Sequence, residues 1–426
     1  MNKTRLFKKS LLAVTISLAT QQAMAAGFQL NAQSATGLGR AFAGDAVIAD
    51  NAAVMSRNPA AMALFDKMEL SLGFEAIMTD ISVKNGTYQS LPGTPFAQSR
   101  DANYDDAGGT SIAPNIHLIV PVNEQFAWGV NAYSNFGTRT DFGSNYAGGE
   151  FGGETEILSV NFGVSGSYRI DSQWSIGAGL DLIYGQGTLK RSFRNDIYTG
   201  PVVDQTTGML NALNGRSIVD IDKADGFGVG FNIGTVYELD ENNRFGLSYR
   251  YSPTITAKDG DKEIKLPLPD MAEFSGYHRI ENTAFAVHYS VQYIGWSAFD
   301  TLEFKNQNID EKDYQWKDGW HYSIGGTYFL NRDWTLRAGY MYDTSAQDKI
   351  TSISVPDSDR QWLSAGFTYQ IDDKSNFDFG FTYLMGKDVK VDETINNPTT
   401  GQTISTISAT TKADAILVGL QYSRSF

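Results

Sequence analysis

The sequence predicts an all-β protein: a 14-stranded antiparallel transmembrane β-barrel with a small N-terminal helical plug, or hatch, in its lumen. From about residue 69 to the end, short segments carry apolar or aromatic side chains at alternate positions and Gly, Ser, Asn or charged residues between them. Because successive side chains of a strand point to opposite faces, each segment has one apolar and one polar face. The connections between segments are alternately short and long, which is typical of outer-membrane barrels.

Residues 1–25 are predicted to be a secretory signal peptide. Basic residues precede an apolar run over 11–19, and a small-x-small cleavage site follows at Ala23, Met24 and Ala25. The apolar run is shorter than the roughly 20 residues that a transmembrane helix needs. The mature chain is therefore expected to begin at Ala26.

Residues 26–68 are predicted to form the plug, and residues 69–426 the barrel. The plug segment is rich in Ala, Gly and Asn and shows no sustained alternation. Short helices are expected over 41–50 and 59–65, the second with Asn58 as its cap and Pro59 at its first position. Neither helix could bury a core of its own, so the segment needs a surrounding wall.

The alternating pattern predicts fourteen strands and two classes of connection. The strands are expected at 70–78, 116–122, 126–132, 158–168, 174–184, 227–239, 245–251, 271–277, 285–293, 320–328, 334–342, 363–371, 377–385 and 416–426. Short turns follow Val122, Ile170, Leu239, Arg279, Leu330 and Ile371, whereas long polar connections cover about 81–113, 138–156, 191–217, 252–268, 298–318, 344–360 and 387–412. This arrangement places both termini at the end with the short turns.

Aromatic and glycine residues support a barrel with a filled lumen. An aromatic residue follows each short turn, as expected of a girdle at the membrane interface: Phe126, Trp174, Phe245, Phe285, Trp334 and Phe377. The opposite, lumenal face is rich in glycine, which suits a wall that the plug approaches closely. A soluble β-sandwich would explain neither the alternating connections nor an apolar face on every strand.

Composition and motifs argue against several other classes of protein. The formal net charge of −14 disfavours nucleic-acid binding. Cysteine is absent, and the four histidines are scattered without metal-ligand spacing, so we expect no metal and no cofactor. The pattern at Gly37 and Gly39 lacks the third glycine of a dinucleotide site. No histidine falls on the predicted lipid face, where an outer-membrane phospholipase would need one, so an enzyme is not expected.

Two other barrel functions stay open on the residues alone. A diffusion porin would have a water-filled lumen and no need of a long plug. A surface adhesin or receptor would carry its function in the long loops. A conductance measurement in planar bilayers would distinguish a large open channel from a plugged one.

Several stretches resemble the FadL-type long-chain fatty acid outer-membrane transporter family. The resemblance runs from Ala26 to Phe426 and is carried by AGFQLNAQSATGLGRAFAGDAVIADNAAVMSRNPA, VPVNEQFAWGVNAYSNFGTRTDFGSNYAGG, YELDENNRFGLSYR, LPLPDMAEFSGYHR and ISVPDSDRQWLSAGFTY. It implies a bacterial outer-membrane protein that takes up long-chain fatty acids passively and releases them sideways into the membrane. Other hydrophobic compounds, such as aromatic hydrocarbons, are the alternative substrates within the same family.

The resemblance also implies partners and ligand-binding residues. Expected partners are the hydrophobic ligand, outer-membrane lipid and lipopolysaccharide, and the barrel-assembly machinery through the C-terminal Phe426. The expected ligand-binding residues are Phe28 beside the mature N-terminus, Arg191 and Lys312 by local alignment, and Arg337 and Asp343 by their lumenal parity. A network of ion pairs that only anchors the plug is an equally open interpretation of the charged lumenal residues.

A lateral opening is expected in the third strand. Its alternation ends at Asn135, Phe136 and Gly137, where Asn and Gly favour a bulge or kink. Unpaired backbone groups in hydrocarbon must be covered, and Asn58, Pro59 and Ala60 of the plug are the expected lining. An ordinary bulge that only shapes the barrel is the alternative.

Overall fold

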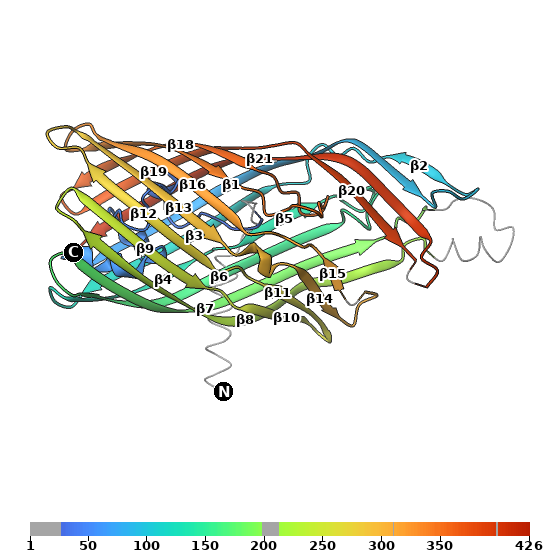
Figure 1. Cartoon of the computed structure of the whole chain (residues 1–426), viewed down its shortest axis with the longest axis horizontal. Helices are drawn as coiled ribbons and strands as arrows, with labels where there is room; N and C mark the ends of the chain where they lie inside the picture. The colour runs from blue at the N-terminus through green and yellow to red at the C-terminus, as the bar shows by residue number, and fades with distance from the viewer. Residues whose placement is uncertain (1–26, 198–212, 310, 398) are drawn as a thin grey trace.

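The computed structural model describes residues 27–197, 213–309, 311–397 and 399–426. Fourteen antiparallel strands form a closed barrel, because the first strand, β1, pairs with the last, β21 (Figure 1). In barrel order the strands are β1 (Glu69–Ser90), β3 (Thr110–Pro121), β4 (Phe126–Tyr133), β6 (Glu154–Arg169), β7 (Trp174–Ser192), β8 (Ser217–Glu238), β9 (Asn243–Tyr251), β12 (Met271–Arg279), β13 (Phe285–Ile294), β16 (Gly319–Phe329), β17 (Trp334–Asp343), β18 (Arg360–Asp372), β19 (Ser375–Gly386) and β21 (Thr403–Ser425). The predicted fold class is confirmed, and a strand begins within six residues of each predicted start except at β8 and β21, which begin earlier.

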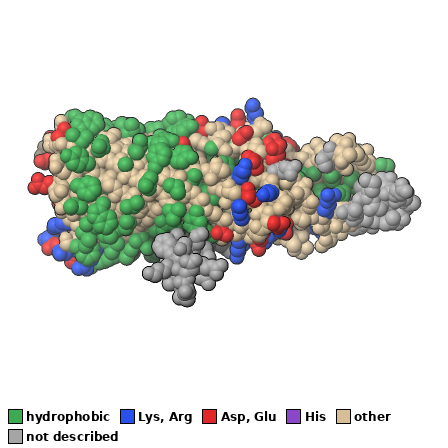
Figure 2. Space-filling view, turned by 90° about the horizontal axis from the view of Figure 1, so that it is seen from below, with side chains coloured by type: hydrophobic (Ala, Val, Ile, Leu, Met, Phe, Trp, Pro, Cys, Tyr) green, Lys and Arg blue, Asp and Glu red, His purple; other side chains and the backbone are tan. Residues whose placement is uncertain are grey.

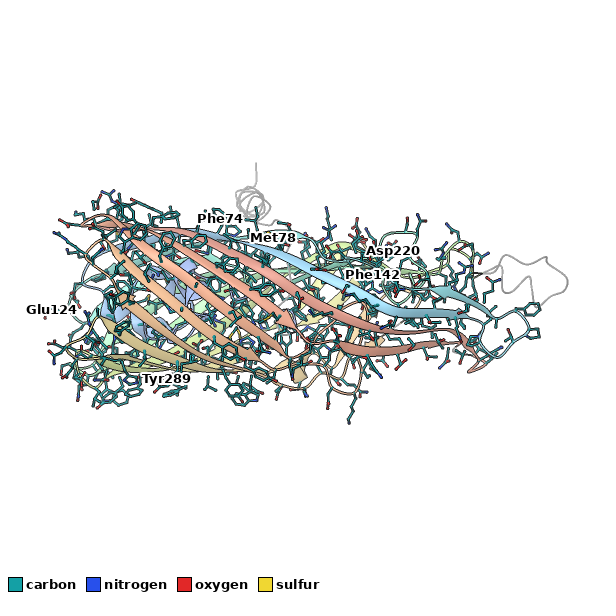
Figure 3. The ribbon with its side chains drawn as sticks, turned by 90° about the horizontal axis from the view of Figure 1, so that it is seen from above. Phe74, Met78, Glu124, Phe142, Asp220 and Tyr289 are labelled. Atoms are coloured by element: carbon teal, nitrogen blue, oxygen red, sulfur yellow. The ribbon has the colours of Figure 1, made fainter. Side chains whose placement is uncertain are left out.

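Short turns and long connections lie at opposite ends of the barrel. Figure 3 shows Glu124, in the turn between β3 and β4, at one end, and Asp220 and Phe142 in the half that carries the long connections. The long connections contain further secondary structure that the sequence did not predict: β2 (Gln98–Asp101), β5 (Gly137–Asp141), β10 (Thr254–Asp259), β11 (Lys262–Pro267), η3 (Trp296–Ala298), β14 (Thr301–Lys305), β15 (Glu311–Asp313) and β20 (Val389–Asn396). Several barrel strands continue outward with them, so that β1 and β21 stay paired as far as Ser90.

The outer surface of the barrel carries an apolar band. Phe227, Val229, Phe231 and Ile233 follow one another on the outward face of β8 and are 40–64% exposed, as the parity of the sequence predicts. Figure 2 shows this band over the half of the molecule with the short turns, and charged side chains beyond its edge. Apolar residues exposed on every side suit a surface that faces lipid.

The plug consists of short helical turns inside the barrel. They are α2 (Ala35–Gly39), η1 (Ala52–Ser56) and η2 (Pro59–Leu64). Asn58 caps η2 through a hydrogen bond from the Ala60 amide, as predicted, although η2 is a 3-10 helix. The helix predicted over 41–50 does not form, because Ala41 and Phe42 adopt positive φ values of 53° and 56° and turns replace it. Among the described residues, no helix is long and apolar enough to cross a membrane.

Lumenal glycines make room for the plug. A Cβ atom added at Gly339 would lie 2.2 Å from the carbonyl oxygen of Arg40, and one at Gly380 would lie 2.3 Å from that of Ala35. On the other side of the barrel, a Cβ atom at Gly177 would lie 2.4 Å from the amide nitrogen of Ala60. Side chains at these positions would therefore displace the plug backbone, which explains the glycine-rich lumenal face.

Candidate functional site

A cluster of buried aromatic side chains surrounds the start of the plug. The Phe28 ring lies 4.6 Å from the Trp296 ring, 5.0 Å from Phe299, 5.8 Å from Trp316 and 6.1 Å from Phe136, measured between ring centroids. These five residues, here called the aromatic cluster, join the plug, the irregular part of the third barrel strand and the connection between β13 and β16. Such a cluster offers an apolar environment to the body of an amphiphile.

Arg191 is a buried cation near the outer end of β7, beyond the apolar band. Its guanidinium donates to the carbonyl oxygens of Glu154 and Lys190, at 2.7 and 2.8 Å, and to the Thr155 hydroxyl, at 2.5 Å. No carboxylate of the described residues lies within 4.0 Å of it. Burial lowers the pKa of Arg191 to about 10. This value is still well above neutral pH, so the guanidinium stays charged.

Lys312 shares neighbours with Arg191. Its ammonium lies 3.7 Å from a carboxylate oxygen of Glu393 and 5.2 Å from the centroid of the Tyr314 ring. Glu393 and Tyr314 also act electrostatically on Arg191, and Tyr314 packs 5.0 Å from Phe299 of the aromatic cluster. The structure thus brings together Arg191 and Lys312, which the sequence singled out separately, beside an apolar cluster.

Arg337 contacts the plug. Its guanidinium donates to Thr368 at 2.6 Å and lies 3.2 Å from the carboxylate of Asp50, which is also paired with Arg40 at 2.8 Å. These partners are the ones expected of a residue that anchors the plug.

Asp343 belongs to a second network, at the other end of the same strand. Its carboxylate lies 3.3 Å from His321 and 3.6 Å from Arg360, and Arg360 is also paired with Asp357 at 2.5 Å. Asp357 accepts a hydrogen bond from the backbone amide of Gly27. The network therefore holds the first described residue of the chain.

The predicted irregularity in the third strand is present. This strand is divided into β4, which ends at Tyr133, and β5, which begins at Gly137, and residues 134–136 form the strand break. The plug pairs with the break through two backbone hydrogen bonds, from Leu30 to Asn135 at 2.6 Å and from Gly137 to Phe28 at 2.8 Å. Residues 28–30, which we call the sealing segment, therefore act as a short substitute strand.

The break leaves a gap in the ladder between β3 and β5. The register between β3 and β4 begins only at Ile116 and Ala132, and β5 is paired with β6. The gap is closed at one end by the pair Ile116 and Ala132, and at the other by a hydrogen bond from Asp141 to Ala107. Ile112 and Ile116, at 41% and 40% exposure, place this gap beside the lipid-facing surface.

The prediction that Asn58, Pro59 and Ala60 line the break was wrong. The Asn58 side chain donates to Ala46 and Thr235, and Ala60 packs against Gly177, so this part of the plug contacts β7 and β8. The hydrogen bonds from the plug to the break come instead from residues 28–30 and from Gln33, which donates to the Asn135 side chain at 3.0 Å. Asn58, Pro59 and Ala60 instead fasten the inner end of the plug.

Sequence reasoning also missed part of the site. Phe299 and Trp316 lie in the connection over about 298–318 that was expected to be long and polar, and Trp296 lies just before it. Three large aromatic residues so close together are themselves a signal of burial. The plug anchors Arg57, 3.3 Å from Glu273, and Asp45, 2.6 Å from Arg40, were not identified either.

Comparison with known proteins identifies the family. Residues 16–426 match the family model described as "Outer membrane protein transport protein (OMPP1/FadL/TodX)". The chain is 36% identical to the long-chain fatty acid transport protein of Escherichia coli O6:H1, with 100% of both chains covered, and 33% identical to outer membrane protein P1 of Haemophilus influenzae, with 99% of both covered. The crystal structure of a Pseudomonas aeruginosa FadL homologue has the same fold at 22% identity, with a TM-score of 0.78 and 94% of this chain and 100% of that one covered. The chain is therefore an outer-membrane protein that belongs to the OMPP1/FadL/TodX family of transport proteins.

Proposed function

We propose that this protein takes up long-chain fatty acids passively across the outer membrane. The ligand enters from the side of the long connections, its carboxylate is held by Arg191 and Lys312, and its alkyl chain lies against the aromatic cluster. Relatives named as long-chain fatty acid transport proteins support this choice of substrate. We further propose that the apolar band contacts outer-membrane lipid and lipopolysaccharide.

The main support for this proposal is the set of hydrogen-bond partners around Arg191. A buried guanidinium normally faces a carboxylate, because burying an unpaired charge is costly. Arg191 has only carbonyl and hydroxyl partners among the described residues. A carboxylate head could add charge-assisted hydrogen bonds, and the neighbouring aromatic cluster suits the chain attached to that head.

The strand break supports release into the membrane. Phe28 belongs both to the aromatic cluster and to the sealing segment, so a ligand that displaces Phe28 also loosens the cover of the break. Moving one buried CH₂ group into water costs about 0.8 kcal/mol of free energy. A sideways path keeps the alkyl chain buried, whereas a path into the periplasm exposes it.

Isothermal titration of the purified protein with oleate and, separately, with toluene tests the substrate. We expect oleate to bind and toluene to bind more weakly, since toluene offers nothing to Arg191. Tighter binding of toluene would assign the protein to hydrocarbon uptake within the family. Binding of neither compound would contradict both functions.

A further inference from the structure

Three neighbouring pairs of barrel strands carry the same arrangement of side chains at their outer ends. In each, a tyrosine near the end of the first strand donates its hydroxyl group to one oxygen of an aspartate that directly precedes the second strand. The other oxygen of the aspartate accepts the backbone amide of a serine just after the first strand. The tyrosine, the aspartate and the serine are Tyr249, Asp270 and Ser252 between β9 and β12, Tyr293, Asp318 and Ser297 between β13 and β16, and Tyr342, Asp359 and Ser345 between β17 and β18. We call each group of three residues a clasp.

The three clasps share one register. Each tyrosine stands opposite the second residue after its aspartate, in the pairs Tyr249 with Ala272, Tyr293 with Trp320 and Tyr342 with Gln361. The hydrogen bonds of the second and third clasps measure 2.8–3.0 Å. Hydrogen bonds to a carboxylate are stronger than those between neutral groups. Each clasp therefore fixes the two ends of a long connection to each other and to the barrel.

The clasp between β13 and β16, here called the middle clasp, lies next to the aromatic cluster. Trp296 directly precedes Ser297, and Trp316 is two residues before Asp318. Both tryptophan rings are buried, with their centroids 5.2 Å apart. A Cβ atom at Gly319, the residue after Asp318, would lie 3.2 Å from the Trp296 ring. The places of both tryptophans therefore depend on how the two ends of this connection are held.

The short helix that carries Trp296 also depends on the middle clasp. The first amides of a helix have no partner within the helix and need one from elsewhere. The side chain of the residue before η3 supplies no such bond, and the carboxylate of Asp318 accepts the Ser297 amide at 2.9 Å instead. Asp318 thus holds the turn from which the Trp296 ring projects.

We infer that the middle clasp positions Trp296 and Trp316 for the alkyl chain of the ligand, so that Asp318 is a positioning residue for substrate binding. A binding wall that is ordered before the ligand arrives avoids the cost of ordering it during binding. Loss of Asp318 removes two hydrogen bonds that join the ends of the connection. The role in binding rests on the proposed function, whereas the dependence of the two tryptophans on Asp318 does not.

Asp270 provides a matched control. Its carboxylate makes the same two hydrogen bonds as that of Asp318, to a tyrosine hydroxyl and to a serine amide. The connection that it closes, between β9 and β12, carries none of the five residues of the aromatic cluster. The Gly295 amide donates to the backbone carbonyl of Asp270 at 2.9 Å, and a side-chain substitution keeps this bond. Asp270→Ala therefore removes a clasp and leaves the cluster in place.

Fluorine NMR of the protein labelled with 5-fluorotryptophan tests the positions of the rings without a ligand. The replacements Trp296→Phe and Trp316→Phe assign the two signals. We expect Asp318→Ala to shift or broaden both signals and Asp270→Ala to leave them unchanged. Asp318→Asn should restore them, because its amide oxygen can accept from Ser297 and its NH₂ group can donate to the Tyr293 oxygen. Unchanged signals in Asp318→Ala, or the same change in Asp270→Ala, would overturn the inference.

Isothermal titration with oleate tests the role in binding. We expect Asp318→Ala to raise the Kd by about tenfold, because the ligand must then order the connection, and Asp318→Asn and Asp270→Ala to stay within about twofold of the unmodified protein. An unchanged Kd in an Asp318→Ala protein whose fluorine signals have moved would overturn the role in binding.

A smaller change covers the case in which Asp318→Ala does not assemble. Tyr293→Phe removes one hydroxyl group from the middle clasp, and Tyr249→Phe is its control in the clasp between β9 and β12. The same two measurements apply, with smaller effects expected in the same direction, and equal behaviour of the two variants would overturn the inference. If the unmodified protein binds no oleate, the proposed function fails, whereas fluorine signals that move only in the Asp318 or Tyr293 variant would still establish that this clasp positions the tryptophans.

Discussion

Two buried arginines of the lumen differ in their partners, and this difference separates binding from anchoring. Arg337 is paired with Asp50 of the plug, whereas the guanidinium of Arg191 donates hydrogen bonds only to neutral oxygen atoms among the described residues. Strand parity was sufficient to place both residues in the lumen. It could not distinguish them, because the partner of Arg337 comes from a segment nearly 290 residues away, for which the barrel pattern gives no register.

Replacing Arg191 should weaken ligand binding. A charge-assisted hydrogen bond contributes about 1.5–3 kcal/mol, so Arg191→Ala is expected to raise the Kd for oleate by roughly ten- to a hundredfold in isothermal titration. Arg194→Ala is the matched control, since Arg194 lies nearby but is already paired with Asp196 at 2.7 Å. Unchanged affinity of the Arg191 variant would assign that residue to structure alone.

At the scale of the element, the plug and the third strand depend on each other. The sequence predicted the break, because Asn135 and Gly137 interrupt a regular alternation. It could not predict that residues 28–30 cover the break, because pairing between segments about 100 residues apart leaves no local signal in either. The wrong assignment of Asn58, Pro59 and Ala60 to the break has the same cause. The cap at the start of η2 depends on neighbouring residues and could be predicted, whereas the wall that η2 contacts depends on residues far away in the sequence.

A side chain at Gly339 should displace the plug. Its Cβ atom would lie 2.2 Å from the Arg40 carbonyl, which is backbone and cannot rotate away. We expect Gly339→Val to raise the conductance of single channels in planar bilayers. Gly326→Val is the control, because the nearest atom to its Cβ is 3.7 Å away and the residue does not face the plug. Equal conductance of the two variants would show that the plug does not depend on this contact.

The end of the last strand is expected to matter for assembly. Phe426 follows β21, is 49% exposed and donates its amide to the Met68 carbonyl at 3.0 Å. Its ring lies at the surface, where the Arg424 guanidinium is 5.6 Å from the ring centroid. If the assembly machinery reads this ring, deletion of Phe426 should lower the amount of heat-modifiable barrel in outer membranes several-fold. Phe126→Ala, which removes another outward aromatic side chain, serves as control. Normal assembly after the deletion would remove this role.

At the scale of the whole molecule, the sequence was sufficient to predict the strands of the barrel, but not the secondary structure of the long connections. Lipid on one side and a plug on the other impose opposite chemistry on alternate residues, and that alternation is visible in every barrel strand. The outward extensions have no lipid to face. Strands such as β10 and β20 therefore carry mixed residues, and the sequence shows only long polar connections there.

The central claim is that the ligand leaves through the strand break when the sealing segment moves. Gln29 and Phe136 form an isolated antiparallel bridge between flanking hydrogen bonds, a geometry in which Cα atoms are about 4.5 Å apart and a disulfide can form. The chain has no other cysteine, so Gln29→Cys with Phe136→Cys would create a single reversible lock.

Oleate uptake by cells carrying this double variant, measured with and without a reductant, is the most direct test. The account predicts that the oxidised protein binds oleate but does not take it up, and that reduction restores uptake. Uptake at the same rate by the oxidised and the reduced protein, with the disulfide confirmed by mass spectrometry, would contradict release through the break.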